Sequence, residues 1–508
     1  MSDLQDFKAF FRKRLSVITF IMLTTLLLYL PKLANFSYSI DSERMINNPA
    51  EVLKSWIGIG RFGLVFLKRF FLFGININPF FINATTYLLL GTSAILLFYI
   101  LDKSTNLSVS FKIIAVLMYV CSPIHFEQTN FILQSTEVLI GYNLLFTSFV
   151  VLGLPGHQTN WYRLLIGVTL TTFSFSIYPS LIIAAATVCT IVFHVSHMQR
   201  SHNPESLVAW LKPFRQMIYM FVISLVSCFL LNKFVLFLTH IAKDPYTSNA
   251  SIWGKVHSTD VITSIKTAFY EQFIVGTKPF IFSITTFLGI AAVLVLLLSI
   301  MKSKFINWPV FLSLFLEYLL ALSPLILLGA SIGPIRALTP TIPLVLMIYV
   351  FTIFYYLNFT SLRVVAAVLM SLLLFSQIKT TSDLEQTDIL TFQSETILSN
   401  QIMHKINELN ITQYHEYRLI VVGSKSFESP LTQHGEVVGH THFDWDNGTR
   451  VGSNQRIHDF FQSKGYAFKE VHPNDYANAV QLTQDFNMKS FPSTDGLKIF
   501  DHTIVVKL

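Results

Sequence analysis

The sequence predicts a mainly α-helical protein that crosses a membrane about eleven times and ends in a small α/β domain. Of its 508 residues, 52% are hydrophobic and only 13% are charged, whereas soluble domains average roughly 25% charged residues. The 47 phenylalanines lie in long apolar runs, and such runs are typical of segments that lipid surrounds. We therefore expect an integral membrane protein.

Apolar runs that approach the length of a membrane span define the predicted helices. A span needs about 20 predominantly apolar residues, and several of the runs are shorter, so their ends are only approximate. The expected spans are residues 15–31, 80–101, 110–123, 137–153, 164–177, 180–195, 217–239, 283–301, 310–328, 341–357 and 364–377.

Basic residues set the predicted orientation, because Lys and Arg accumulate on the cytoplasmic side of a membrane. A cluster of them in residues 8–14 precedes the first run, and Lys103 and Arg163 lie in short loops that alternate to the same side. The N-terminus is then cytoplasmic, and an odd number of spans places the C-terminus outside. The longest hydrophilic segments, residues 32–79, 240–282 and 378–508, also fall outside.

The formal charge of +7 indicates a lipid partner and no nucleic acid. The basic residues lie mostly at the ends of apolar runs, where they attract anionic headgroups. The three cysteines, Cys121, Cys189 and Cys228, fall within or beside apolar segments. They have neither disulfide nor zinc spacing, so we interpret them as small hydrophobic side chains.

Two domains follow from the change of composition near Gln377. Residues 1–377 form the predicted transmembrane domain, and residues 378–508 form an extracytoplasmic α/β domain. Within the latter, 389–409 has helical spacing, while 419–423 and 499–508 have the pattern of strands.

The first outer loop carries candidate catalytic groups. Asp41, Glu43 and Arg44 come directly after the first span. A carboxylate at a low-dielectric boundary binds a proton more readily, which suits it to accept a proton from a hydroxyl nucleophile. The alternative is an ordinary salt bridge on a solvated loop.

Residues 51–73 alternate apolar and basic side chains, which predicts one amphipathic helix in the membrane interface. Lys54, Arg61 and Lys68 recur every seven residues, so they would form a stripe along it. A lipid phosphate could bind this stripe. Simple anchoring to acidic lipid is the alternative, especially for Lys68 and Arg69.

Other polar residues near the outer rim are candidates for substrate binding. His125, Glu127 and Gln128 follow the third span, Tyr178 lies between the fifth and sixth, and Arg336 precedes the tenth. A guanidinium matches phosphate geometry. The alternatives are a helix-end polar group for His125, an interfacial aromatic for Tyr178 and contact with lipid headgroups for Arg336.

Several histidines and aspartates lie close together in the C-terminal segment. His440 and His442 flank one residue, which on a strand would place both on one face. The spacing matches no known metal motif, and Asp446 begins a turn-like Asp-Asn-Gly sequence. We therefore expect a solvated loop and no metal. The full group is His434, His440, His442, Asp444 and Asp446.

The motif Ile40 to Glu43 (Ile-Asp-Ser-Glu), followed by Trp56 to Gly63 (Trp-Ile-Gly-Ile-Gly-Arg-Phe-Gly), resembles the Gtr-type membrane glucosyltransferases. That family decorates bacterial surface polysaccharides. The similarity extends over most of the chain, including Phe175 to Pro179 and Arg336.

The resemblance implies an inverting, metal-independent glycosyltransferase of the GT-C fold, without a cofactor, in the bacterial cytoplasmic membrane. It would move a hexose such as glucose from a polyprenyl-phosphate carrier to an acceptor glycan outside that membrane. Asp41 would deprotonate the acceptor hydroxyl, and Glu43 would orient the acceptor or assist. The donor phosphate would be held by Arg44, Arg61, Arg336 and Lys54, and the substrates would also contact His125, Glu127, Gln128 and Tyr178.

Two other functions fit a polytopic chain with basic grooves. One is a transporter or flippase of lipid-linked sugars, although such proteins commonly have inverted repeats and polar groups at mid-membrane, which the sequence lacks. The other is a non-catalytic membrane partner of a glycan-assembly enzyme, in which Asp41 would be replaceable.

Overall fold

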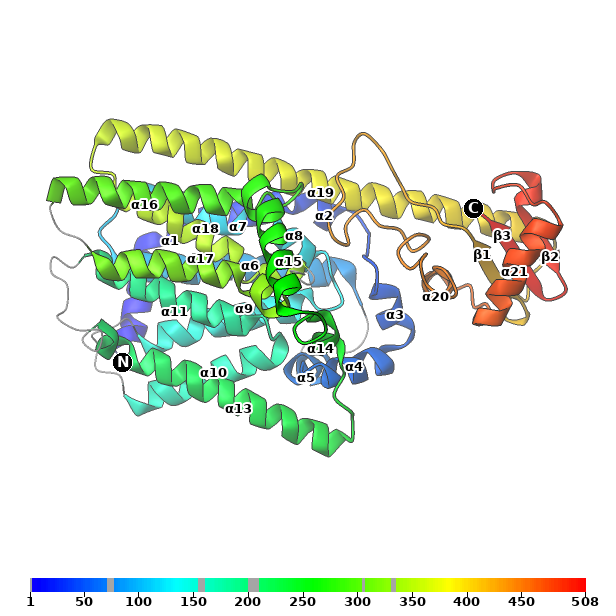
Figure 1. Ribbon diagram of the computed structural model, residues 1–508, viewed down its shortest axis with the longest axis horizontal. Coiled ribbons are helices and arrows are strands. Elements are labelled where there is room, and N and C mark those ends of the chain that lie inside the picture. The colour runs from blue at the N-terminus through cyan, green and yellow to red at the C-terminus, as the bar shows by residue number, and fades with distance from the viewer. Residues whose placement is uncertain (1, 71–76, 154–159, 200–209, 304–306, 330–334) are drawn as a thin grey trace.

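The computed structural model describes residues 2–70, 77–153, 160–199, 210–303, 307–329 and 335–508. A bundle of long helices occupies most of the molecule, and a smaller mixed region extends from one end of it (Figure 1). The N-terminus lies toward the far end of the bundle and the C-terminus lies beside the mixed region. The two termini are therefore at opposite ends of the long axis.

The described chain is mainly helical, and its strands lie near the C-terminus. Its elements are α1 (Ser2–Leu28), α2 (Leu30–Ala34), α3 (Ser42–Asn47), α4 (Pro49–Gly58), α5 (Phe62–Phe70), α6 (Pro79–Ser104), α7 (Val109–Val120), α8 (Ile124–Thr129), α9 (Ser135–Leu152), α10 (Trp161–Ile177), α11 (Leu181–Met198), α13 (Arg215–Thr239), α14 (Tyr246–Ala250), α15 (Ser258–Phe269), α16 (Ser283–Ser303), α17 (Trp308–Leu328), α18 (Ile342–Tyr356), α19 (Thr360–Glu408), β1 (Arg418–Val422), α20 (Asn454–Ser463), α21 (Pro473–Asp485), β2 (Leu497–Phe500) and β3 (Thr503–Lys507).

Within the described ranges, eight helices are long and apolar enough to cross a membrane. They coincide with eight of the expected spans. The other three expected spans correspond to α1, which carries basic residues in its first half, and to α7 and α10, which have 12 and 17 residues. The chain is a membrane protein, and its exact number of spans stays a prediction.

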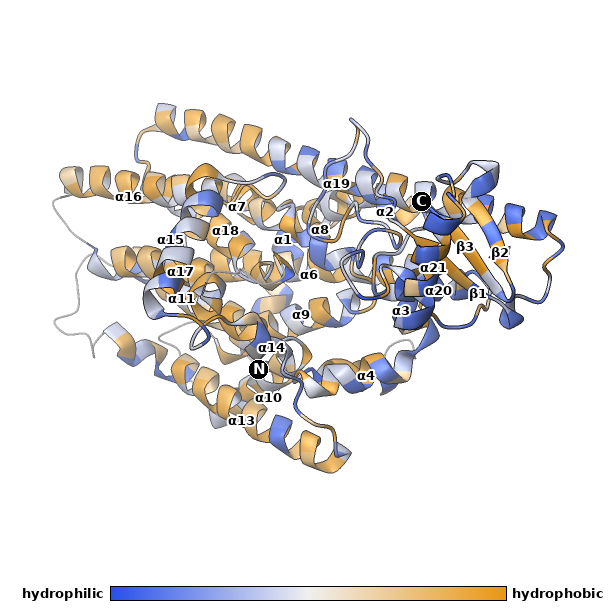
Figure 2. Cartoon of the chain, turned by 45° about the vertical axis from the view of Figure 1, so that its right-hand side comes forward, coloured by the Kyte–Doolittle hydropathy of each residue, from blue (hydrophilic) through white to orange (hydrophobic). Residues whose placement is uncertain are grey.

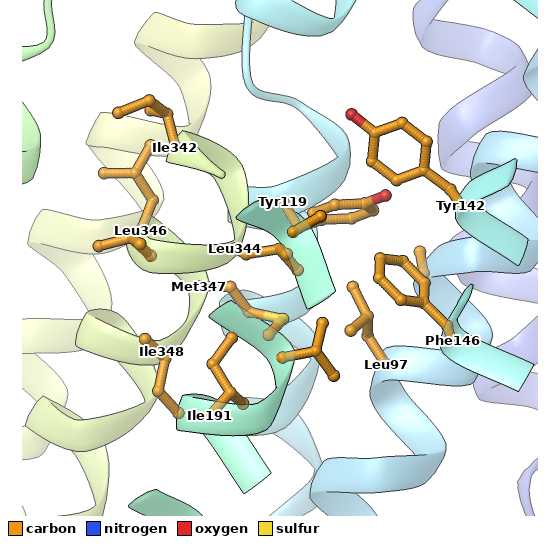
Figure 3. Close-up of a cluster of buried hydrophobic side chains, with 14 of the residues drawn as sticks. Leu97, Tyr119, Tyr142, Phe146, Ile191, Ile342, Leu344, Leu346, Met347 and Ile348 are labelled. Atoms are coloured by element: carbon orange, nitrogen blue, oxygen red, sulfur yellow. The ribbon is translucent and has the colours of Figure 1, made fainter. Parts of the chain in front are cut away.

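The bundle is most tightly packed around α18. In the most apolar stretch of residues 335–356, which contain α18, 94% of the residues are buried, against 6% for residues 212–239, which contain α13. Helix α18 is therefore central and α13 is peripheral. Figure 3 shows Met347 of α18 among buried side chains from neighbouring helices, including Tyr119 and Phe146. Hydrophobic residues cover the bundle, and hydrophilic ones gather toward the mixed region (Figure 2).

The single amphipathic helix predicted for residues 51–73 is wrong. The structure has two shorter helices, α4 and α5, separated at Gly60, whose φ of 86° lies in the left-handed region that glycine adopts readily. The stripe of three cations does not form either. Lys54 is exposed, Arg61 lies at the break, and the buried Lys68 is paired with Glu137 at 2.7 Å. Residues 71–73 lie outside the described residues.

A single helix, α19, joins the bundle to the mixed region. It has 49 residues and passes without interruption through Gln377, so the helix predicted at 389–409 is its second half. The division into two domains at residue 377 stays a prediction. The change of composition marks the point where α19 leaves the apolar bundle (Figure 2).

The predicted strand at 419–423 is confirmed as β1, whereas the strand predicted at 499–508 is two strands, β2 and β3. The chain turns between them at Asp501, which has a φ of 52°. The sheet order is β1-β3-β2, with β1 parallel and β2 antiparallel to β3. This sheet and its helices form the mixed region.

Helix α20 brings the C-terminal region against the first outer loop. The side-chain amide of Asn47 at the end of α3 donates to the carbonyl oxygen of Asp459 at 2.6 Å. The hydroxyls of Tyr38 and Ser463 are 2.7 Å apart. Residues more than 400 positions apart in sequence are therefore neighbours at the end of the bundle that is next to the mixed region.

The contact between α5 and α10 can be tested at Gly63. A Cβ at this position would meet the hydroxyl of Ser176 and lie 3.0 Å from its backbone carbonyl carbon. We expect Gly63→Ala to destabilise the protein by about 1 to 3 kcal/mol, because overpacking outweighs the helix propensity that alanine adds. Thermal unfolding in detergent measures this change. Gly448→Ala, with nothing within 4 Å of the new Cβ, is the control, and an equal effect of both would refute the close approach.

Candidate functional site

A cavity of about 540 Å³ lies where α3 and α4 face the end of the bundle that is next to the mixed region. The first loop supplies acidic, basic and aromatic side chains, and other loops complete the wall. Five residues singled out from the sequence converge here, namely Asp41, Arg44, Arg61, Tyr178 and Arg336. The rest of the lining is Glu51, Val52, Ser55, Trp56, Ile59, Phe131, Leu133, Gln134, Asp244 and Tyr246.

Asp41 stands directly before α3 in an uncommon backbone conformation. Its φ of 74° is left-handed, a region in which Asp is one of the few side chains found regularly. The side chain is 43% exposed, and its Oδ1 accepts a hydrogen bond from Nη1 of Arg456 at 2.7 Å. The carboxylate is thus held at the cavity wall by a guanidinium and remains partly open to solvent.

Glu43 lies behind the cavity wall. Its side chain is 1% exposed, and it does not line the cavity. One oxygen accepts from Nη1 of Arg456 at 3.0 Å, and the other is 3.1 Å from Nε2 of His442. Both partners belong to the C-terminal region, so Glu43 connects that region to the loop that carries Asp41.

His442 is buried between two carboxylates. Its Nε2 faces Glu43, and its Nδ1 is 2.9 Å from Oε2 of Glu395 on α19. Burial by itself would lower the pKa of His442, but the two carboxylates outweigh it and raise the pKa to about 10. The imidazole is therefore charged at neutral pH and donates a hydrogen bond on each side.

Arg61 is positioned by the break between α4 and α5. Its Nη1 donates to the side-chain oxygen of Gln134 at 2.7 Å, and its guanidinium lies 4.8 Å from the centre of the Tyr178 ring. Burial lowers the pKa of Arg61, and the nearby charge of Arg336 adds to the effect. Arginine nevertheless stays protonated in proteins. Two guanidiniums near one another favour an anion beside them.

Arg336 reaches the same cavity from the segment before α18. Its guanidinium lies 4.2 Å from the centre of the Phe131 ring and 3.6 Å from Oε1 of Glu436. In the described part of the chain, Nη1 of Arg336 and Nε of Arg61 are buried without a hydrogen-bond partner. Buried donors of this kind are normally satisfied, so both arginines retain capacity to bind an acceptor such as a phosphate oxygen.

The remaining two cations of the predicted donor site lie differently. Arg44 lines the cavity, but it is half exposed and forms an ion pair with Glu51 at 3.1 Å. Lys54 is exposed on α4 and is not part of the cavity lining. The cavity therefore draws its buried positive charge from Arg61 and Arg336.

Helix α8 holds three predicted substrate contacts in the interior, away from the cavity lining. His125, Glu127 and Gln128 are all buried. Burial lowers the pKa of His125 to about 3. Glu127 accepts hydrogen bonds from the backbone N–H groups of Glu436 at 2.5 Å and Val437 at 3.2 Å, and burial raises its pKa to about 7. In this structure Glu127 supports the C-terminal segment.

The C-terminal histidines do not lie on a strand. Residues 442–448 form turns, so the two histidines do not share the face of a strand, and the predicted loop is solvated only in part. His440 is partly exposed, whereas His442 is buried in the ion-pair network. Among the residues that the structure describes, no group of three or more His, Cys, Asp or Glu has the geometry to hold a metal ion.

The first-loop motif and the arginines at this cavity carried the resemblance noted in the sequence, and a family comparison tests it. The model of the glucosyl transferase GtrII family matches residues 30–357, which is more than half of the chain. The chain belongs to the glucosyl transferase GtrII family. No curated protein and no solved structure matches it at a significant level.

The GtrII match runs from the end of the first span through α18. It contains Asp41, Arg61 and Arg336, and it ends before α19. Membership therefore supports glycosyl transfer by the part of the chain that forms the cavity. The C-terminal region, which holds Arg456 and His442, lies beyond the match.

The residues that hold Asp41 and Glu43 were not predicted from the sequence. Arg456 and Glu395 were not singled out, and His442 was assigned to a solvated loop. No local pattern distinguishes Arg456 from other arginines, because its partners Asp41 and Glu43 are more than 400 positions away. Only Asp446, which accepts from Nε of Arg456 at 2.5 Å, is close in sequence, and ten residues separate them.

The charged state of His442 makes stability depend on pH. Because its pKa in the folded protein, about 10, exceeds the ordinary 6.5, its contribution is complete below about pH 6.5 and disappears as pH rises through 10. We expect His442→Gln to destabilise the protein by about 3 to 5 kcal/mol at pH 7, because it breaks a buried ion pair. This difference should shrink toward pH 10.5 in thermal unfolding.

His440→Gln is the matched control, since His440 is partly exposed and only two residues away. It should follow the wild-type profile over the same pH range. A His442→Gln profile parallel to the wild type would show that the imidazole is neutral in the folded protein.

Proposed function

We propose that the chain is a membrane glucosyltransferase that moves glucose from a polyprenyl-phosphate carrier to a hydroxyl group of a surface glycan. The observation that carries this proposal is the cavity, which is lined by Asp41 and also by Arg61 and Arg336. A carboxylate that can take a proton and cations that can hold a phosphate are the two requirements of this transfer.

In the proposed reaction the acceptor hydroxyl attacks the anomeric carbon of the carrier-linked glucose. Its proton passes to Asp41, the new glycosidic bond forms, and the bond from the anomeric carbon to the phosphate oxygen breaks. Arg456 contacts only Oδ1 of Asp41, which leaves Oδ2 for the proton. A single displacement by one hydroxyl inverts the configuration at the anomeric carbon.

The departing polyprenyl phosphate gains negative charge as its bond to the sugar breaks. We assign its stabilisation to Arg61 and Arg336, because both have a buried N–H group without a partner in the described chain. Charge stabilisation by fixed donors in a partly buried site is among the largest contributions to catalysis. The two guanidiniums supply the positive charge that a metal ion provides in other transferases.

Aromatic residues of the cavity complete the proposed substrate site. Trp56, Tyr178 and Tyr246 line it, and such amphipathic rings commonly contact sugars and lipid at a membrane boundary. Tyr178 already packs under Arg61, so it serves the donor side.

The proposed orientation places the cavity outside a bacterial cytoplasmic membrane. Asp6 near the N-terminus pairs with Lys103 at the end of α6 at 3.0 Å, so these basic segments lie together at one end of the bundle. Helices α3 and α4, whose residues line the cavity, lie toward the opposite end, beside the hydrophilic region (Figures 1 and 2). By the bias of Lys and Arg toward the cytoplasm, the cavity end faces outward.

The role of Asp41 can be tested with Asp41→Asn, which keeps the shape and tolerates the left-handed backbone. We expect transfer of radiolabelled glucose from the polyprenyl phosphate in membranes to fall by about 10²- to 10⁴-fold, the usual contribution of a general base. Asp501→Asn is the control, because Asp501 is also left-handed, with a φ of 52°, but lies exposed between β2 and β3.

Wild-type activity in Asp41→Asn would remove this carboxylate from the mechanism. If the wild-type chain transfers no glucose but moves the lipid-linked sugar across the membrane of vesicles, the protein is a flippase and the transferase proposal is refuted.

The assignment of Arg61 and Arg336 predicts a loss on the donor side. Changing either to Gln should lower kcat/KM for the polyprenyl-phosphate donor by about 10²- to 10³-fold, because a charge-stabilising donor is removed. Arg69→Gln is the control, since Arg69 is exposed at the end of α5. Steady-state kinetics with varied donor measures the effect, and equal losses in all three variants would contradict a specific phosphate site.

A further inference from the structure

We propose that Arg456, in the C-terminal region, is a positioning residue that fixes Asp41 and Glu43 for transfer. The catalytic apparatus then includes a segment that lies beyond the match to the GtrII family, which ends at residue 357. The inference rests on the proposed role of Asp41 as the base. It adds a residue that does not line the cavity and acts through one that does.

The geometry of Arg456 ties three carboxylates to one guanidinium. Its Nη1 lies 2.7 Å from Oδ1 of Asp41 and 3.0 Å from Oε1 of Glu43, and its Nε lies 2.5 Å from Oδ2 of Asp446. The rigid fork of arginine fits such multiple contacts, which the single ammonium of lysine cannot reproduce. Two acids of the first loop and one of the C-terminal region are thereby held at fixed separations.

Burial makes this contact energetically important. The side chains of Arg456 and Glu43 are 15% and 1% exposed, and breaking a buried ion pair leaves an uncompensated charge. Burial by itself would lower the pKa of Arg456, but the carboxylates of Asp41 and Glu43 outweigh it and raise that pKa. The two acids therefore favour the charged form of the guanidinium.

Arg456 itself is held on a rigid support. It lies in the first turn of α20, which begins at Asn454. The side chain of Asn454 accepts from the backbone N–H of Val421 at 2.7 Å and donates to the carbonyl oxygen of the same residue at 2.8 Å. Val421 belongs to β1, so the position of the guanidinium follows from the sheet.

Glu43 has a second support that leaves Asp41 dependent on Arg456. His442 bridges Glu43 and Glu395 of α19, at 3.1 and 2.9 Å, so Glu43 stays anchored when Arg456 is removed. The ion pairs of Asp41 within the described chain involve Arg456 alone. With a left-handed backbone and a side chain 43% exposed, Asp41 is the residue that should move when this contact is lost.

The test compares Arg456→Ala and Arg456→Lys with Arg450→Ala, a control in the exposed part of the same segment. We expect kcat to fall roughly 10- to 100-fold in Arg456→Ala, as small misplacements of catalytic groups do. The KM for the polyprenyl-phosphate donor should stay within about twofold, because its arginines are untouched. Arg456→Lys should recover part of kcat, and millimolar guanidinium should raise the rate of Arg456→Ala only.

The inference is overturned if folded Arg456→Ala keeps the wild-type kcat, if Arg450→Ala loses as much, or if the donor KM rises while kcat does not change. It is also overturned if guanidinium and Arg456→Lys recover nothing while thermal unfolding shows an intact fold. Should Arg456→Ala fail to fold, the kcat of Arg456→Lys decides, because that variant keeps the charge.

A wild-type chain that transfers no glucose would refute the proposed function. The contact between Arg456 and Asp41 can then still be tested by thermal unfolding. Non-additive effects of Arg456→Lys and Asp41→Asn on thermal unfolding would support the positioning contact, since residues in contact are energetically coupled. Additive effects would refute it. The two failures are thus distinguishable.

Discussion

A largely buried network of opposite charges joins the loop after α2 to the C-terminal region, and the geometry of the cavity depends on it. Arg456 and His442 come from the C-terminal region, while Asp41 and Glu43 come from the loop after the first span. Glu43 and His442 are buried and Arg456 is largely buried, and desolvation of an unpaired ion is unfavourable. The two parts of the chain must therefore assemble for either to be properly formed.

The long helix α19 makes this assembly possible. It leaves the apolar bundle without interruption and carries Glu395, the second carboxylate partner of His442, into the hydrophilic region. A continuous helix transmits the position of the bundle to the sheet more rigidly than a loop does. The C-terminal region thereby acts as a fixed support behind the cavity, and Glu127 of α8 adds a second attachment by accepting two of its backbone N–H groups.

Opposite charges are also separated within the cavity. Asp41 is held by the C-terminal support, whereas Arg61 and Arg336 lie against the rings of Tyr178 and Phe131. The aromatic rings favour the cations without using their N–H groups. Although Arg336 also contacts Glu436 at 3.6 Å, Nε of Arg61 and Nη1 of Arg336 have no hydrogen-bond partner in the described chain, which leaves capacity for an anionic ligand. Separate supports for the base and for the cations prevent them from collapsing into an ion pair with one another.

Local sequence patterns predicted much of the fold and part of the site. The apolar runs predicted the long helices, the strand at 419–423 was correct, and Asp41, Arg61, Arg336 and Tyr178 do converge. Predictions failed where a backbone break or a distant contact decides. The helix expected at 51–73 breaks at Gly60, and His125 on α8 is buried in the interior.

The sequence by itself determined that the chain is a membrane protein and that it resembles the Gtr-type glucosyltransferases, because hydropathy and short motifs are properties of neighbouring residues. Only the tertiary structure decided which charges meet. Arg456 lies 415 positions from Asp41. His442, between α19 and α20, bridges Glu43 and Glu395 because α20 packs against α3. Pairing across such separations depends on packing, which no local pattern records.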